Sequence, residues 1–375
     1  MDALQYAKDI VAFDTTSDLS NLALTNYIED RLRKMDFHTE RLEYSDENGV
    51  RKASVVGKKG EGSGGMAYFG HIDVVPAINW FTKKHGPFEP SVDGDKLYGR
   101  GTCDMKGSVA TMMAAAERFK VNELKRPIYI ACTADEEVGY GGAIQVKEQS
   151  KLYREMVEAQ SNTIIGEPTL LEVVYAHKGG CSFKAIARGE SAHSSTKLGM
   201  NANWIMIPFL SKMKALYEET QNNSEWQDFE FDPPTLCGNI GIEDNPKAMN
   251  VKKPVSICRV GFRLMPKTQT DLLVERVEKA AKECNVELTI NRGHEAFRVD
   301  PNSSFIKEVL DITEKPKALA AGYGSEASVY TDLKRRLLIG PGNVEQAHTF
   351  DEWISTDQLQ LGTEQYVEFV QNWCQ

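Results

Sequence analysis

The strongest constraint on the fold of this chain is an alternation of short apolar runs with helical patterns. Strands are predicted at residues 53–57, 65–70, 127–134 and 162–166, and helices lie between the later ones at 105–120 and 141–153. Alternation of this kind predicts an α/β sheet covered by helices on both faces. The same pattern resumes after residue 294, with a helix at 302–313, a strand at 335–342 and a closing helix at 355–373.

A second pattern interrupts the first between about residues 177 and 293. It predicts a strand at 179–189, a helix at 201–220, strands at 235–243 and 255–265, a helix at 269–284 and a strand at 286–293. The order β-α-β-β-α-β is that of a ferredoxin-like sandwich. The 375 residues also exceed the size at which one hydrophobic core stops growing. We therefore predict an α/β domain of residues 1–176 and 294–375, with a smaller domain of residues 177–293 inserted.

Charge and composition exclude several classes of function. The formal net charge of -10 disfavours binding to phosphate backbones, so we expect no nucleic-acid partner. No apolar run approaches membrane-spanning length, and the amphipathic start of the chain lacks the features of a signal peptide. The seven cysteines are odd in number and include no C-x-x-C pair, which argues against a disulfide framework or a cysteine zinc site. We expect a cytoplasmic protein that binds no membrane.

Histidines and carboxylates recur where the predicted strands end. Open α/β sheets bind ligands beyond the carboxyl ends of their strands. The residues found there are His71, Asp73, Asp135, Glu136, Glu137 and Glu167, and His348 follows the last strand. Asp104 stands at the start of a helix, where it is predicted to be the N-cap. These side chains are therefore expected to gather at one edge of the sheet.

The number of these groups indicates two metal ions. A single catalytic zinc takes three protein ligands and a water, whereas two histidines with three or four carboxylates suit two metals that share a bridging carboxylate. Nitrogen and oxygen ligands fit zinc, with cobalt or manganese as alternatives. Taken singly, each residue has a simpler explanation: a strand-end histidine is commonly a surface residue, and Asp104 alone is a helix cap. Their combination on one sheet favours the metal centre.

Six motifs carry a resemblance to a known family. They are GHIDVVP, YGRGTCDMKG, ADEEVG, IIGEPT, SAHSS and QAHTFDEWI. In order and approximate spacing, over nearly the whole chain, they resemble the M20 family of zinc amidohydrolases. The resemblance implies a zinc-exopeptidase-like mixed sheet flanked by helices, with an inserted ferredoxin-like lid domain. It also implies hydrolysis of the amide bond of an N-acyl amino acid.

The resemblance further implies a ligand set for two zinc ions per chain. His71 and Glu167 would hold one ion, Glu137 and His348 would hold the other, and Asp104 would bridge them. In this family the peptide bond that follows the bridging aspartate tends to be cis, which predicts a cis bond after Asp104.

Glu136 and Asp73 are predicted to be catalytic without binding metal. Asp73 would accept a hydrogen bond from the second ring nitrogen of His71 and so fix its tautomer. Two metals lower the pKa of a bound water toward about 7, and a neighbouring carboxylate takes its proton as the amide carbon is attacked. Glu136, which no metal needs, is the predicted general base. Asp135 has no assigned chemistry beyond orienting the loop.

Three residues of the inserted domain are candidates for substrate contact. His193 resembles a family histidine that stabilises the oxyanion, usually in the active site of a partner subunit, which implies a homodimer formed through the lid. Without the resemblance it would be interpreted as a surface-loop histidine. Asn250 and Arg263 resemble lid residues that bind substrate, and a guanidinium suits a free carboxylate. Arg263 also fits a solvent-facing strand position.

The stretch GYGSEASVY (322–330) bears on the substrate. Ser325 and Glu326 are closer to the threonine–glutamate–alanine pattern of acetylornithine deacetylases than to the pattern of desuccinylases, and Glu326 would pair with the ammonium group. The expected substrate is N-acetyl-L-ornithine. Alternatives are a succinyl-diaminopimelate desuccinylase, an acetyl-citrulline or acetyl-lysine deacetylase, and a metallo-carboxypeptidase. A non-catalytic binding protein, which is a different class, would be expected to have lost a ligand or the base.

Overall fold

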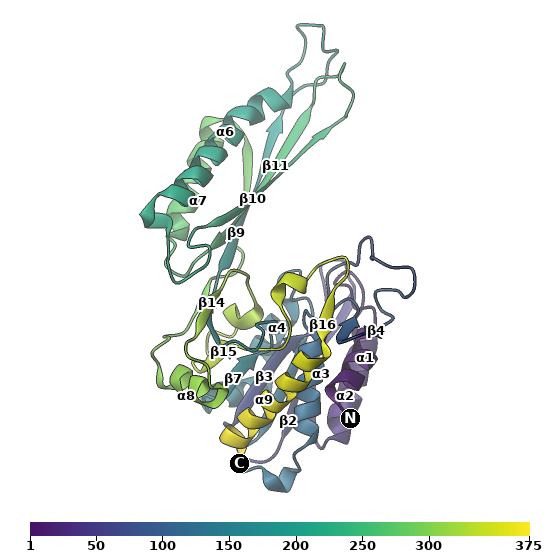
Figure 1. Cartoon of the computed structure of the whole chain (residues 1–375). Coiled ribbons are helices and arrows are strands. Elements are labelled where there is room, and N and C mark those ends of the chain that lie inside the picture. Colours follow the sequence, from purple (N-terminus) through teal and green to yellow (C-terminus); the bar gives the residue numbers. More distant parts are fainter. The chain divides into compact units, whose positions relative to one another are not determined.

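The computed structural model describes residues 1–375, which divide into two compact units (Figure 1). The first unit comprises Met1–Tyr175, Val299–Leu319 and Ser325–Gln375, and the second comprises Ala176–Arg298 and Ala320–Gly324. None of the helices combines the length and apolar character that crossing a bilayer requires. The first unit is thus assembled from segments at both ends of the chain.

The first unit contains seven α-helices, a large mixed sheet and a small antiparallel sheet of β4, β5 and β16. Its helices are α1 (Ala3–Val11), α2 (Leu22–Lys34), α3 (Lys106–Glu117), α4 (Gly141–Gln149), α5 (Lys151–Glu158), α8 (Ser304–Thr313) and α9 (Thr356–Cys374). Its strands are β1 (His38–Ser45), β2 (Arg51–Lys59), β3 (Met66–His71), β4 (Ser91–Asp93), β5 (Lys96–Tyr98), β6 (Ile128–Thr133), β7 (Asn162–Ile165), β15 (Arg336–Leu338) and β16 (Trp353–Ser355). Three further strands, β8 (Val174–His177), β13 (Phe297–Arg298) and β14 (Leu319–Ala321), lie in the sequence where the units adjoin.

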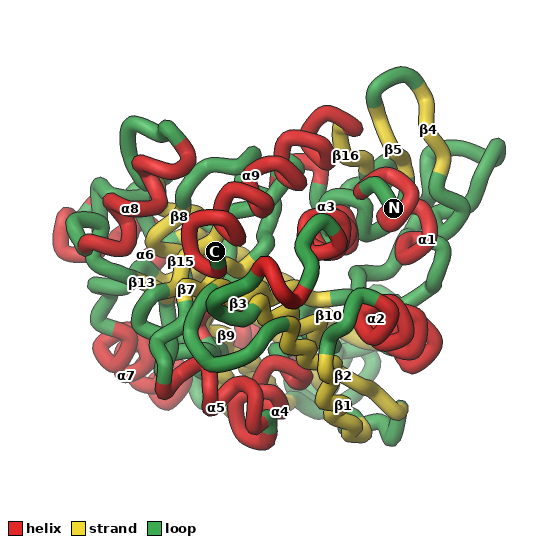
Figure 2. Tube along the Cα trace, turned by 90° about the horizontal axis from the view of Figure 1, so that it is seen from below, coloured by secondary structure: helices red, strands yellow, loops and turns green.

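The larger sheet has nine strands, six of which follow the order β1-β2-β6-β3-β7-β15. The strands β6, β3, β7 and β15 are parallel neighbours, whereas β1, β2 and β6 pair antiparallel. Figure 2 shows α3 and α9 over one face of this sheet and α4 and α5 over the other. Every residue of β3 and β6 is buried, as strands covered on both faces require. The predicted mixed sheet flanked by helices is confirmed.

The helix α3 packs close to its neighbours α1 and α9 because its residues are small. Every residue from Gly107 to Ala116 is buried, and most of them are glycine, serine or alanine. Two sequence expectations about the helices of this unit are wrong. The N-cap of α3 is Met105, because the carboxylate of Asp104 contacts two histidines instead. The helix predicted at 141–153 divides at Ser150, whose hydroxyl caps α5 by accepting from the Tyr153 amide.

The second unit has a four-stranded antiparallel sheet and two helices. In chain order the elements are β9 (Gly179–Arg188), α6 (Ala202–Asn222), β10 (Cys237–Asn245), β11 (Val255–Leu264), α7 (Thr270–Glu283) and β12 (Glu287–Asn291). The strands lie in the order β10-β11-β9-β12, so β10 is an edge strand. Burial alternates along β9 and β11, which shows that one face of the sheet packs against the helices and the other does not.

Candidate metal centre

The parallel strands β6, β3 and β7 bring three acidic or histidine segments to one edge of the sheet. His71 is the last residue of β3 and is level with Thr133, the last residue of β6. Glu136 and Glu137 follow β6 after a short turn, and Glu167 follows β7. The carboxyl ends of parallel neighbours meet at the same edge, so the chain order of these strands already places the groups together.

Asp104 lies at the centre of two overlapping groups of metal-binding atoms. One group is His71, Asp104 and Glu167, and the other is Asp104, Glu137 and His348; within each, the ligand atoms lie within 4.8 Å of one another. The Nε2 atom of His71 is 3.1 Å from Oδ1 of Asp104, and the Nε2 atom of His348 is 3.2 Å from Oδ2. The two oxygens of one carboxylate therefore face two different histidines. The peptide bond between Asp104 and Met105 is cis, as the resemblance predicted.

The electrostatics of the centre reflect carboxylates crowded in a buried place. Burial raises the pKa of Glu136 and of Glu167 well above the usual range; neighbouring carboxylates raise both further, and the charge of His71 opposes this. Burial would lower the pKa of His71, but the contact with Asp104 and the charge of Glu136 raise it overall. Such a cluster retains protons that a divalent cation would displace on binding.

The donor set fits divalent metal ions. The Oε1 atom of Glu167 is buried and has no hydrogen-bond partner, although buried carboxylate oxygens are normally satisfied. Together with two imidazoles and two further carboxylates it offers only nitrogen and oxygen ligands, which zinc, cobalt and manganese accept. Glu136 also lies in a group with His71 and Glu137, so it adjoins the same centre.

Asp73 holds the segment that carries the two glutamates. Its Oδ1 accepts from the amide of Glu136 at 3.0 Å, and its Oδ2 accepts from the amide of Glu137 at 3.3 Å and from the hydroxyl of Ser17 at 2.8 Å. The Nδ1 atom of His71 lies 3.0 Å from the main-chain oxygen of Asp73 and 3.6 Å from its carboxylate. The carboxylate is therefore bonded more closely to the loop than to the imidazole.

Several residues that surround the centre had not been singled out from the sequence. Arg100 and Glu352 form a buried pair beside Asp104, and both lie in motifs already quoted, so a signal was available. Lys52 and Tyr44 contact Asp135 from β2 and β1. No motif marks these last two residues.

The candidates for substrate contact fall in both units. His193, Asn250 and Arg263 belong to the second unit, where the Nδ1 atom of His193 lies 2.7 Å from the hydroxyl of Ser195. In the first unit Ser325 caps a 3-10 turn, and the adjacent Glu326 is fully buried, with its Oε2 accepting from Thr133 at 2.7 Å. Their roles toward substrate stay predictions.

The motifs and the geometry agree with a comparison against known families. The model of peptidase family M20/M25/M40 matches residues 67–372. The chain belongs to this family. Acetylornithine deacetylase from Pectobacterium carotovorum subsp. carotovorum (strain PC1) is 30% identical over 384 aligned positions, which cover 99% of this chain and 96% of that protein. Membership of the M20 family makes the chain a hydrolase and implies that it binds divalent metal.

Solved structures of M20 relatives share the fold. Human carnosine dipeptidase 1 matches with a TM-score of 0.77 at 18% identity, covering 98% of this chain and 95% of that one. The YXEP protein of Bacillus subtilis, described as a dinuclear metal-binding peptidase from the M20 family, matches with a TM-score of 0.61 at 15% identity, covering 98% and 96% of the two chains. At these identities the likeness concerns the fold.

Proposed function

We propose that this M20 protein is a dizinc amidohydrolase that cleaves the amide bond of an N-acyl amino acid. The observation that carries the proposal is the pair of ligand groups that share Asp104, with Glu136 beside them and outside both. His71 and Glu167 would hold one ion, and Glu137 and His348 the other. When bound, two such ions polarise the amide carbonyl and acidify water. Cobalt or manganese would serve the same ligands.

Glu136 would move the proton in this reaction. Its carboxylate accepts a proton from the attacking water and then delivers it to the departing amine. Glu136 lies in one group with His71 and Glu137, which places its carboxylate close to the ligands that would hold the ions. Asp73 supports this role, because it fixes the main chain at Glu136 and Glu137 by accepting from both amides.

The proposed substrate is N-acetyl-L-ornithine. Its support is the similarity to proteins named acetylornithine deacetylase, which are 30% and 29% identical over 99% of this chain. In this proposal Arg263 and Asn250 bind the substrate's polar groups, His193 stabilises the oxyanion, and Ser325 and Glu326 contribute to the choice of side chain. Succinyl-diaminopimelate, acetyl-citrulline, acetyl-lysine and peptides with a free carboxyl end are the competing substrates.

Metal analysis together with a substrate panel tests the proposal. Protein purified without chelator should carry about two metal ions per chain, since paired-metal sites of this kind hold both ions during turnover. The panel should contain acetylornithine and each competing substrate, and we expect the highest kcat/KM for acetylornithine. Protein that binds no metal and hydrolyses no member of the panel would instead support a non-catalytic binding protein.

We also propose that two copies associate through the second unit. Trp204, Ile207 and Tyr217 on α6 are exposed, and so are Ile240 and Ile242 on the edge strand β10. Edge strands with apolar side chains favour pairing with another strand, and a second copy of β10 provides one.

The seven cysteines are all free, which suits the reducing cytoplasm that we propose as the location.

A further inference from the structure

Asp135 occupies the turn that delivers Glu136 and Glu137 to the metal centre. Its φ of 58° is left-handed, a conformation that non-glycine residues adopt at a cost. The turn closes on its main-chain oxygen, which accepts from the amide of Tyr140 at 2.7 Å. The direction of the next two residues therefore depends on what holds Asp135 in place.

Two partners hold the carboxylate of Asp135, and both come from the β1–β2 pair. The Nζ atom of Lys52 lies 2.9 Å from Oδ1, as an ion pair without the alignment of a good hydrogen bond. The hydroxyl of Tyr44 donates to Oδ2 at 2.7 Å. Tyr44 and Lys52 are direct partners across the antiparallel pair, so one position of the ladder supplies both contacts.

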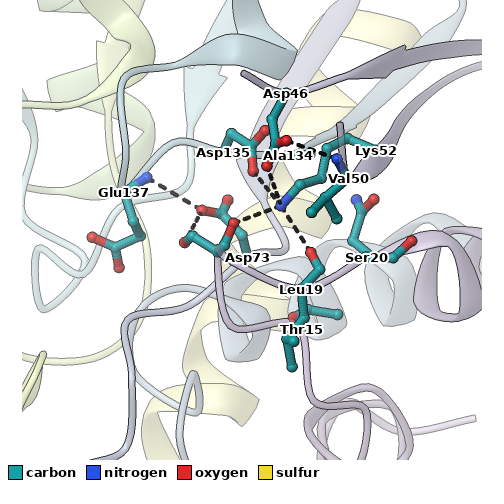
Figure 3. A network of polar contacts seen from close by, with 12 residues as sticks. Thr15, Leu19, Ser20, Asp46, Val50, Lys52, Asp73, Ala134, Asp135 and Glu137 are labelled. Atoms are coloured by element: carbon teal, nitrogen blue, oxygen red, sulfur yellow. Dashed lines mark hydrogen bonds and ion pairs between the residues drawn. The ribbon is translucent and has the colours of Figure 1, made fainter. Parts of the chain in front are cut away.

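Lys52 is also linked, through Ser17, to Asp73, the second carboxylate that holds the turn. Figure 3 shows its amine between Asp135 and the carbonyl of Leu19, to which it donates at 2.8 Å. The amine donates in addition to the main-chain oxygen of Ser17. The hydroxyl of Ser17 in turn donates to Asp73, whose carboxylate accepts from the amides of the two glutamates. One ammonium group thus joins the two carboxylates that fix the turn.

The burial of Lys52 makes these bonds costly to lose. Its side chain is 1% exposed and that of Asp135 is 6% exposed, so water cannot replace either partner. A buried charge whose partner is removed is strongly destabilising. Residues that hold metal ligands in place commonly contribute about 10–100-fold to metal affinity or activity, and Lys52 would act on the ligand segment through Asp135 and Asp73.

We infer that Lys52 is a positioning residue of this enzyme: its ammonium sets the turn at Asp135 and thereby the placement of Glu136 and Glu137 at the metal centre. For Glu136 the inference rests on the proposed function, because the role of Glu136 is catalytic. For Glu137 it does not, because the placement of Glu137 affects metal affinity, which can be measured without a substrate. Lys52 itself touches neither metal-ligating group, and its effect passes through Asp135 and the Ser17 segment.

The test compares Lys52→Met with Lys59→Met in the full-length, metal-loaded protein. Lys59 is the matched control, because it is a buried lysine on the same strand and its amine donates only to the main-chain oxygen of Ala116, at 3.1 Å. Zn2+ affinity is measured by competition with a chelator, and kcat and KM with the best substrate of the panel. We expect Lys52→Met to lower kcat about 10–100-fold with a smaller change in KM, and to weaken the binding of one of two Zn2+ ions.

A general loss of stability is separated from positioning by the same variants. Lys59→Met should lower the unfolding midpoint. Because Lys59 has no contact with the turn or the metal centre, kcat and Zn2+ affinity should stay within about twofold of wild type. If Lys52→Met does not fold, the double variant Lys52→Met/Asp135→Asn removes both charges of the buried pair, and the remaining partner Asp46, 4.0 Å from the amine, is 16% exposed to water. The double variant should show the same loss of kcat and Zn2+ affinity.

Two outcomes would overturn the inference. Wild-type kcat and Zn2+ affinity in folded Lys52→Met, or in the double variant, would show that the turn does not depend on the lysine. Equal losses in Lys52→Met and Lys59→Met would assign the effect to stability. If wild-type protein hydrolyses no amide of the panel, the proposed function fails, yet the Zn2+ titrations still decide whether Lys52 places Glu137.

Discussion

Arg100 and Glu352 form a buried ion pair that joins two segments of the metal centre, although 252 residues separate them in the chain. The Glu352 carboxylate also accepts from the amides of Cys103 at 2.9 Å and Asp104 at 3.0 Å. The guanidinium of Arg100 donates to the main-chain oxygen of Thr349 at 3.0 Å, next to His348. The pair therefore fixes the segment that carries Asp104 against the one that carries His348.

Glu352→Ala should destabilise the protein and weaken metal binding together. The substitution leaves the Arg100 guanidinium buried and unpaired, which costs about 3–5 kcal/mol of unfolding free energy. It also frees the main-chain amide of Asp104, so we expect Zn2+ affinity to fall about 10–100-fold. Urea denaturation and chelator competition measure the two effects. Glu364→Ala is the control, because its pair with Arg118 is about half exposed, at 52% and 47%, and should contribute less than about 1 kcal/mol. Similar losses in both variants would contradict the prediction.

Glu136→Gln and Glu137→Gln should separate proton transfer from metal binding. The amide introduced by Glu136→Gln keeps the shape of the side chain but cannot take a proton, so we expect nearly full metal content with kcat lower by about two to four orders of magnitude. Glu137→Gln should instead lose metal, since Glu137 lies in the group with Asp104 and His348. Metal content measured on the same samples as kcat provides the check. Comparable activity in Glu136→Gln and wild type would remove Glu136 as the base.

Glu326 should make the metal-free protein less stable as the pH rises. Burial raises the pKa of Glu326 from 4.5 to about 7. Between these values the folded state binds more protons than the unfolded state, so unfolding free energy falls with rising pH, by up to about 3 kcal/mol. Glu326→Gln keeps an acceptor for Thr133 and removes the titration. Urea denaturation at pH 5 and pH 8 should therefore show a larger fall for wild type than for Glu326→Gln. If the unfolding free energies of wild type and Glu326→Gln fell by the same amount between pH 5 and pH 8, burial would not be disfavouring the ionised form of Glu326.

The placement of His71 and Glu167 could be predicted from the sequence because each stands at the end of a predicted strand. His71 ends the fully buried strand β3, Glu167 follows the mostly buried strand β7, and adjacent parallel strands bring such positions to one edge. The strands β4, β5 and β16 could not be predicted in this way, because three residues are too few to establish a period.

The contacts that Lys52 and Tyr44 make with Asp135 could not be predicted from local sequence pattern either. The strand β1 has mostly half-exposed or exposed residues, so it lacks the apolar run that marked the central strands, and its pairing with β2 was not predicted. A lysine such as Lys52 is ordinarily a surface residue, and only the tertiary positions of Asp135 and Ser17 explain its burial. For Asp104, the local pattern alone predicted a helix cap, whereas its place between His71 and His348 was predicted only through the family resemblance.

Mixed dimers should reveal whether His193 acts across a subunit interface. His193→Ala and Glu136→Ala proteins should each be nearly inactive, since each lacks one group of the proposed reaction. If His193 serves the partner's site, an equal mixture that exchanges subunits contains dimers with one complete site, which restores about a quarter of wild-type activity. The control mixes Glu136→Ala with Glu137→Ala, because both positions lie in the first unit and no exchange can complete a site. Sedimentation should first show a dimer. Exchange of subunits without recovered activity would place His193 outside the partner's site.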